Sequence, residues 1–227
     1  MKLYKFRSLR GCESDMDDEN SDFSRSKKIL ETGKFWCSKF SELNDPMEGV
    51  FYAQRDSIPG VYNEKNKYKI CSFSARVENK RGFENPCMWG YYANGFKGIA
   101  IEVEVCEDKV EKMKYGEKVP GINDSKPIIE EIKKILKFKT RPWRHEAEFR
   151  FLSYEGKEEE EIGEITKVHF GNPYGNISNK AGIYKDNRWL KDYDVIKEHL
   201  IKVAKEKRID CYAVNVEGSK VLAGQKL

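Results

Sequence analysis

The stretch WRHEAEFRFL, from Trp143 to Leu152, combines charged side chains with the apolar alternation of a β-strand. Strand side chains alternate between two faces. The predicted core face consists of Ala147, Phe149 and Phe151. The other face carries Glu146, Glu148 and Arg150, and a fixed carboxylate of this kind can stabilise positive charge that develops on a sugar. The alternative is an exposed strand face with ion pairs worth less than about 1 kcal/mol each.

Two further segments carry candidate binding residues. In ELNDPMEG, Asn44 and Asp45 precede a proline, which is typical of a turn or a helix start. The alternative is that both residues line the same pocket as Glu148. In MWGYY, Trp89 and Tyr92 lie three residues apart on one face of an expected helix, where they either pack in the core or wall a pocket for a planar ligand.

Other residue types argue against several common chemistries. The three histidines are too dispersed for a metal site or a Ser-His-Asp triad, and no glycine-rich phosphate loop is present. The six cysteines contain no CxxC pair, so we expect reduced thiols without a structural metal or a disulfide. Reduced thiols are typical of a cytoplasmic protein.

The elements that must position these residues are numerous strands and a few helices. The 227 residues suit one domain over residues 1–227. The predicted strands are residues 2–8, 34–38, 68–74, 96–105, 164–171 and 211–216. The predicted helices are residues 21–33, 86–95, 123–139 and 193–207. Strands do not alternate regularly with helices, which predicts an α+β fold with a central mixed or mostly antiparallel sheet.

Neither bulk charge nor hydropathy points to a nucleic-acid or a membrane partner, although a local basic patch stays open. Lys and Arg number 42 against 38 acidic residues, so bulk charge does not indicate a nucleic-acid-binding protein. No segment approaches the roughly 20 apolar residues of a membrane span. The N-terminal sequence MKLYKFRSLRG lacks the apolar run of a signal peptide.

Several motifs together resemble a bacterial family known only as a domain of unknown function. They are LYKFRS, ELNDPMEG, ICSFS, MWGYYANGFKGIAIEV, WRHEAEFR and VHFG, and their order covers most of the chain. A weaker resemblance is to ADP-ribosyltransferases that carry an Arg on the first strand, a Ser-x-Ser strand and a later Glu-x-Glu. This chain matches that order with Arg7, with Ser72 and Ser74, and with Glu146 and Glu148.

The second resemblance implies an ADP-ribosyltransferase-like fold and an enzyme that consumes NAD as its substrate, without a metal. Glu148 would be the catalytic carboxylate. The residues implied for NAD are Arg7 at the phosphates, Ser72 and Ser74 at the ribose, and Trp89 and Tyr92 at the nicotinamide ring. The residues implied for the substrate side of a cleft are Glu146, Asn44, Asp45 and Arg150. The acceptor would be a protein, a nucleic acid or water, and such bacterial enzymes often serve as toxins or anti-phage effectors.

The sequence departs from that pattern, and two other functions stay open. Phe73 replaces the threonine commonly found between the two serines, and the segment between Ser74 and Glu148 is long. One alternative is a metal-dependent nuclease. Its carboxylates would be Asp45, Glu102, Glu146 and Glu148. The other alternative is a binding or regulatory module without chemistry, in which Arg7 and the glutamates form structural ion pairs.

Overall fold

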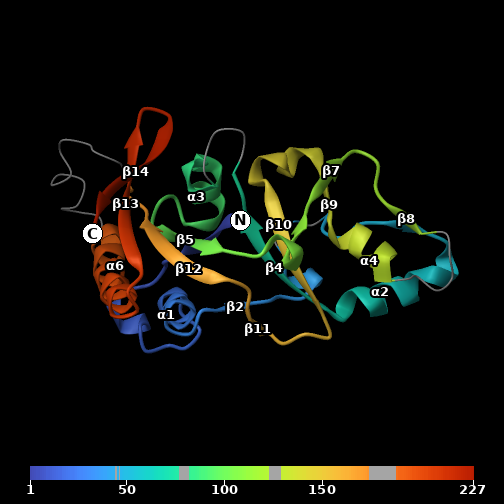
Figure 1. The fold of residues 1–227 in the computed structure, drawn as a ribbon, viewed down its shortest axis with the longest axis horizontal. Coiled ribbons are helices and arrows are strands. Elements are labelled where there is room, and N and C mark those ends of the chain that lie inside the picture. Colours follow the sequence, from blue (N-terminus) through green and yellow to red (C-terminus); the bar gives the residue numbers. More distant parts are fainter. Residues whose placement is uncertain (44, 46, 77–81, 123–128, 174–187) are drawn as a thin grey trace. The chain divides into compact units, whose positions relative to one another are not determined.

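The fold is α+β, and its largest sheet is mixed and mostly antiparallel, which confirms the predicted class. The computed structural model describes residues 1–43, 45, 47–76, 82–122, 129–173 and 188–227. The eight strands of the largest sheet follow the hydrogen-bonded order β14-β13-β12-β5-β1-β4-β10-β6 (Figure 1). Within the described part of the chain, no helix is long and apolar enough to cross a membrane.

The chain divides into two compact units. The first unit comprises Met1–Lys34, Ser74–Val105 and Gly163–Leu227, and the second comprises Phe35–Phe73 and Cys106–Ile162. The prediction of one domain over residues 1–227 stays a prediction.

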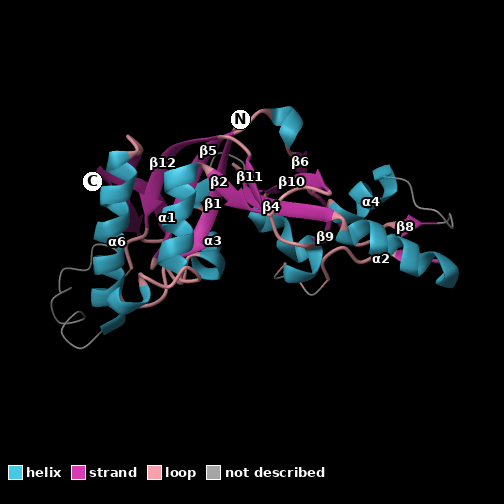
Figure 2. Ribbon diagram, turned by 90° about the horizontal axis from the view of Figure 1, so that it is seen from below, coloured by secondary structure: helices cyan, strands magenta, loops and turns pink. Residues whose placement is uncertain are grey.

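The first unit is built from strands covered by helices. Its strands are β1 (Lys2–Ser8), β5 (Gly98–Glu104), β12 (Glu164–Phe170), β13 (Asp210–Glu217) and β14 (Lys220–Lys226). Its helices are α1 (Asp22–Thr32), α3 (Pro86–Tyr92) and α6 (Arg188–Glu206), with short 3₁₀ turns η1 (Glu13–Asp15) and η4 (Gly82–Glu84). Figure 2 shows α1 and α6 beside one another, and these two helices contact each other.

Strand β5 lies inside the sheet, between β1 and β12, and residues 98–103 of this strand are all buried. It pairs antiparallel with β1, where Tyr4 is opposite Glu102, and antiparallel with β12 on its other side. Strand β12 in turn pairs parallel with β13. A strand that reads as an uninterrupted buried run needs cover on both faces. Helices α1 and α3 contact the neighbouring strand β1 from opposite faces of the sheet.

Local capping residues explain where two helices begin, as predicted. Ser21 caps α1 by accepting a hydrogen bond from the Ser24 amide, and Gly33 ends this helix in the left-handed conformation at φ 70°. Asn85 caps α3 by accepting from the Cys87 amide, and Pro86 occupies the first turn. Helix α6 begins at Arg188, five residues before its predicted start.

The second unit contains shorter elements. Its strands are β2 (Lys34–Trp36, with Lys34 in the first unit), β3 (Tyr52–Ala53), β4 (Tyr68–Ser74, with Ser74 in the first unit), β6 (Glu111–Lys112), β7 (Lys114–Gly116), β8 (Gly121–Ile122), β9 (Phe138–Thr140), β10 (Glu148–Tyr154) and β11 (Glu159–Glu161). Its helices are α2 (Ile58–Asn66) and α4 (Ile129–Leu136), and its 3₁₀ turns are η2 (Phe40–Glu42), η3 (Arg55–Ser57), η5 (Glu107–Lys109) and η6 (Arg141–Glu146).

An apolar cluster holds the second unit together. It consists of Val61, Tyr68, Ile70, Ile122, Ile132, Ile135 and Leu136. Its members come from α2, β4, β8 and α4. The cluster therefore packs together elements that are separated in the sequence. Burial of apolar surface of this kind contributes about 25 cal/mol per Å².

The structure corrects several sequence-based expectations. The predicted helix over residues 123–139 is α4, described from Ile129; it ends at Leu136, and β9 follows from Phe138, while residues 123–128 lie outside the described residues. Helix α2 and strand β14 were not predicted. The predicted strand over 143–152 begins only at Glu148, because residues 141–146 form η6 and Ala147 takes a left-handed conformation at φ 44°.

Two glycines of the first unit provide a matched test of packing. A Cβ at Gly98 would collide with the Arg7 carbonyl oxygen and lie 2.8 Å from the Ala93 Cβ, whereas a Cβ at Gly90 meets nothing within 4 Å. We expect Gly98→Ala to lower the free energy of unfolding by about 1–3 kcal/mol. Gly90→Ala in α3 should raise it by about 0.5–1 kcal/mol, because alanine is the better helix former. Urea denaturation of both variants measures these changes, and equal effects would contradict the packing of β5.

Candidate functional site

The charged residues of the stretch at 143–152 converge in the second unit, but in a buried cluster rather than on an open strand face. Glu146 is the last residue of η6, and the left-handed Ala147 separates it from β10, which Glu148 begins. Glu146 and Glu148 are 3% and 4% exposed, and Arg150 is fully buried. Glu146 is therefore not on the strand face that Glu148 and Arg150 share, and the expectation that the three residues face a cleft stays a prediction. Phe149, expected in the core, is only half-buried.

Arg150 is the centre of the cluster. Its Nε donates to Glu148 Oε1 at 2.6 Å. Its two terminal nitrogens donate to both carboxylate oxygens of Glu48, at 2.6 and 2.8 Å, and Nη1 also donates to the Leu136 carbonyl at 2.6 Å. The planar guanidinium suits this two-pronged contact, which a lysine cannot make.

A second cation, Lys139 of β9, lies between the remaining carboxylate oxygens. Its Nζ is 2.6 Å from Glu146 Oε2, 2.7 Å from Glu148 Oε2 and 3.9 Å from Glu48 Oε2. The Trp143 ring lies 5.2 Å from the same ammonium. The cluster thus contains three carboxylates and two cations, each at most 9% exposed. Its formal charge is −1.

Opposite charges in the cluster favour the ionised forms of Glu148, Lys139 and Arg150. Burial alone would raise the pKa of Glu148, but the Arg150 and Lys139 charges outweigh burial and hold that pKa well below its ordinary value. Burial likewise would lower the pKa values of Lys139 and Arg150, and the surrounding carboxylates raise both instead. Burial raises the pKa of Tyr115, whose hydroxyl accepts a hydrogen bond from the Glu148 amide at 2.8 Å.

The motif ELNDPMEG supplies Glu48, and the turn around it explains the motif. Asp45 is buried and accepts from the Met47 amide at 2.9 Å, which shapes the turn. Gly49 has φ 62°, and its carbonyl accepts from the buried Lys65 ammonium at 2.6 Å. The positive φ favours glycine here, and a Cβ would also lie 2.8 Å from that ammonium. Two buried cations, Arg150 and Lys65, therefore fix the turn.

Lys65 is enclosed by aromatic rings. The ring centroids of Phe40, Phe51 and Tyr62 lie 4.0, 5.2 and 5.0 Å from its Nζ. Burial lowers the pKa of Lys65 to about 8, against the opposing charge of Glu48.

Sequence reasoning missed three members of the cluster, Glu48, Lys139 and Tyr115. The signal for them was indirect. A strand face with Glu and Arg is either exposed to solvent or buried against residues of opposite charge. When those residues come from other parts of the sequence, the spacing of residues along the strand does not reveal them. Of the predicted substrate residues, Asn44 lies outside the described residues, and Asp45 supports the turn.

The residues expected to bind NAD are divided between the two units. Ser72 is half-buried in the second unit, whereas Arg7, Ser74, Trp89 and Tyr92 belong to the first.

Within the first unit, Arg7 lies on the opposite face of the sheet from Ser74 and Trp89. Arg7 Nε contacts Ser26 of α1 at 3.4 Å. Phe6, one position earlier and therefore on the other face, packs against Trp89 of α3 at 5.3 Å. Ser74 is opposite Tyr4 in the ladder and shares the face of Phe6. Trp89 is fully buried, and its Nε1 donates to the Phe83 carbonyl at 2.6 Å, which makes it a core residue.

Glu102, a carboxylate of the nuclease alternative, forms a separate polar cluster in the first unit. It accepts from Lys2 at 3.0 Å, Tyr4 at 3.1 Å and Thr166 at 2.9 Å. Burial would raise its pKa, but hydrogen bonds from His169, Lys2 and Thr166 lower that pKa below its ordinary value. In the residues that the structure describes, no group of three or more His, Cys, Asp or Glu side chains is arranged to hold a metal ion.

A buried and an exposed arginine test the energetic role of the cluster. Arg150→Met leaves the Glu48 and Glu148 carboxylates buried without their main partner, and we expect a loss of about 3–5 kcal/mol in the free energy of unfolding. The control is Arg141→Met, because Arg141 pairs with Glu117 at 2.9 Å with side chains 69% and 77% exposed. This control should change stability by less than about 1 kcal/mol. Equal effects of the two substitutions, measured by urea denaturation, would contradict a structural role of Arg150.

Acid should destabilise the protein through Glu102 and Glu148. Their folded pKa values lie below the ordinary value, so their contribution is complete above about pH 4.5 and is lost as the pH falls toward the folded values. Glu102→Gln should therefore lower stability at pH 7 and make the loss between about pH 5 and 3 shallower than in the native protein. Glu104→Gln, at the neighbouring exposed position, should leave the acid profile unchanged. If the free energy of unfolding of Glu102→Gln falls with pH in parallel with that of the native protein, ionised Glu102 does not stabilise the fold.

Comparisons with protein-family models, with curated proteins and with solved structures found no match for this chain. A function must therefore be inferred from the chemistry of its own residues.

Proposed function

We propose that this protein is an NAD-consuming enzyme, an ADP-ribosyltransferase-like protein or an NAD glycohydrolase, with Glu148 as its catalytic carboxylate. The observation that carries the proposal is the approach of two carboxylates to one cation. Glu146 and Glu148 each lie within 2.7 Å of the Lys139 ammonium. Two ionised carboxylates in this arrangement stabilise a positive charge, and positive charge is what cleavage of the nicotinamide–ribose bond builds on the sugar.

The surrounding residues give the two oxygens of Glu148 different environments. Oε1 is fixed by Arg150, while Oε2 is directed at Lys139. Under the proposal, Lys139 moves aside and the developing charge of the sugar takes the place of its ammonium beside Oε2. Trp143, which already lies against that ammonium, offers an aromatic surface for the nicotinamide ring. Arg150 keeps the carboxylate ionised and in place throughout.

The acceptor of the ADP-ribose is part of the same proposal. Water as the acceptor makes the reaction NAD hydrolysis, and a protein or nucleic-acid acceptor makes it a transfer. The resemblance to bacterial ADP-ribosyltransferases favours a role as a toxin or an anti-phage effector.

A second candidate function is a binding or regulatory module without chemistry, in which the cluster is purely structural. The burial of the charged cluster favours this second candidate. Glu148 is only 4% exposed, and both of its oxygens already face a cation. A carboxylate that no substrate reaches contributes stability alone.

Two variants separate the candidates. If the enzyme proposal is correct, Glu148→Gln should reduce NAD cleavage by about 10²-fold or more, because the amide lacks the charge that the transition state needs. Lys139→Met should preserve or raise cleavage, because it leaves Oε2 open to the substrate. Nicotinamide release followed by ¹H NMR measures both, at a temperature where circular dichroism shows each variant folded.

Glu117→Gln is the matched control, since Glu117 pairs with an arginine on the surface. It should leave NAD cleavage unchanged. If the native protein releases no nicotinamide, or if Glu148→Gln is fully active, the enzyme proposal fails. In that case both cluster variants should lower only the melting temperature.

A further inference from the structure

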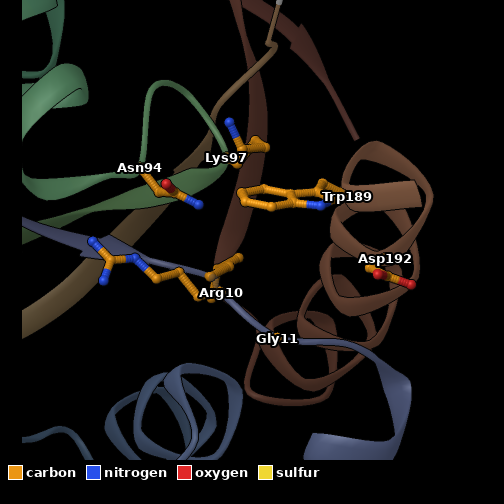
Figure 3. Close-up of a pocket in the computed structure, with 7 residues that line it drawn as sticks. Arg10, Gly11, Asn94, Lys97, Trp189 and Asp192 are labelled. Atoms are coloured by element: carbon orange, nitrogen blue, oxygen red, sulfur yellow. The ribbon is translucent and has the colours of Figure 1, made fainter. Parts of the chain in front are cut away.

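We propose that the first unit contains a nucleotide-binding pocket, distinct from the Glu148 cluster, in which Trp189 stacks on the base while Arg10 and Lys97 bind the phosphate. The pocket has a volume of about 520 Å³. Its walls are Leu9, Arg10, Gly11, Asn94, Lys97, Trp189 and Asp192. Figure 3 shows the Trp189 ring in the middle of this group. Ligand pockets in proteins typically measure about 300–1,000 Å³.

The walls of the pocket are held by backbone contacts. The Leu9 amide donates to the Lys97 carbonyl at 3.1 Å, which ties the end of β1 to the turn after α3. That turn is sharp, since Asn94, Gly95 and Phe96 have φ values of 49°, 61° and 66°. Such left-handed residues are kept only where the surrounding structure determines them. Here the Phe96 ring stacks on the buried Trp89 at 5.2 Å, so the turn is anchored in the core.

The opposite wall, α6, is anchored as well. The Tyr193 hydroxyl lies 2.7 Å from the Gly171 carbonyl and 3.2 Å from the Gly98 carbonyl, and it joins α6 to β5 and to the end of β12. Trp189 and Asp192 lie within one turn of Tyr193 on this helix. The pocket is thus formed before any ligand arrives, which reduces the ordering cost of binding.

The charges at the pocket favour an anion. Among the residues that the structure describes, no carboxylate forms an ion pair with the Arg10 guanidinium or the Lys97 ammonium, in contrast to the saturated Arg150 and Lys139. The nearby Asp22 carboxylate accepts from the Arg10 backbone amide at 3.0 Å. The acidic residue of the lining, Asp192, already has Arg188 at 3.7 Å. Arg10 and Lys97 both line the pocket and give it positive charge for an anion, and an arginine can bind a phosphate through two parallel hydrogen bonds.

Trp189 adds the second half of the recognition. Its side chain is 72% exposed, so the ring is accessible to a ligand in the pocket. An indole ring next to cations is the arrangement that stacks a nucleic-acid base and binds its phosphate. A neutral sugar would use the ring but not the cations, and a free phosphate would use the cations but not the ring. A nucleotide uses both.

The ligand can be a free nucleotide or a nucleotide within a single-stranded chain, and titration calorimetry separates these sources. The probes are AMP, adenosine, inorganic phosphate and a short oligo(dA), each added to the native full-length chain. We expect AMP to bind at least about 10-fold more tightly than adenosine or phosphate, because only AMP engages ring and cations together. Tighter binding of AMP than of oligo(dA) assigns the site to free nucleotides, and the reverse order assigns it to a nucleic-acid strand.

Variants of the lining connect binding to the pocket. Trp189→Ala should weaken AMP binding about 10-fold, within the range measured for base stacking on aromatic side chains. Arg10→Ala should weaken AMP binding but leave adenosine binding unchanged. Matched controls in the same unit are Tyr91→Ala, another exposed aromatic, and Lys202→Ala, an exposed cation of α6. Both should bind AMP as the native protein does.

The proposal is overturned if neither AMP nor oligo(dA) binds, or if Trp189→Ala and Arg10→Ala bind AMP as the native protein does. This result is independent of the enzyme proposal, because every residue of the pocket belongs to the first unit and Glu148 belongs to the second. Binding of AMP that survives Glu148→Gln but not Trp189→Ala would place the nucleotide in this pocket whatever the outcome of the NAD assays.

Discussion

The second unit depends on one buried guanidinium. Arg150 donates four hydrogen bonds, to Glu48, Glu148 and the carbonyl of Leu136. These partners belong to the turn that contains Glu48, to β10 and to the end of α4, so one side chain joins three separate segments of the second unit. A buried charge is costly unless it is fully paired. The positions of all three segments are therefore set together, and the turn can accept only residues that keep Glu48 in reach.

The same pairing makes structure and chemistry hard to separate at Glu148. Its two oxygens face two different cations, and removal of any member leaves an unmatched charge in the interior. Effects of substitutions within such a network do not add. Lys139 is the member whose removal is informative, because it lowers the positive charge of the cluster without breaking the contact between Arg150 and Glu48.

The parts of the fold that could be predicted are those with local signals. Ser21, Gly33 and Pro86 mark helix ends because such signals act within one turn of the helix. The alternation in WRHEAEFRFL correctly indicated that Glu148 and Arg150 share a face, but it extended the strand past Ala147, whose left-handed backbone ends η6. Glu48 could not be predicted as the partner of Arg150, because that contact spans 102 positions and leaves no trace in spacing.

The cations of this protein differ in how much of their charge is already used, and this difference indicates where ligands can bind. Arg150 and Lys139 are surrounded by carboxylates in the interior, so their field is cancelled at short range. Lys65 is likewise committed, to a carbonyl and three aromatic rings. Arg10 and Lys97 instead line a pocket next to an exposed indole. Buried and paired cations such as Arg150 stabilise the fold, whereas the positive charge of Arg10 and Lys97 is available to attract an anion.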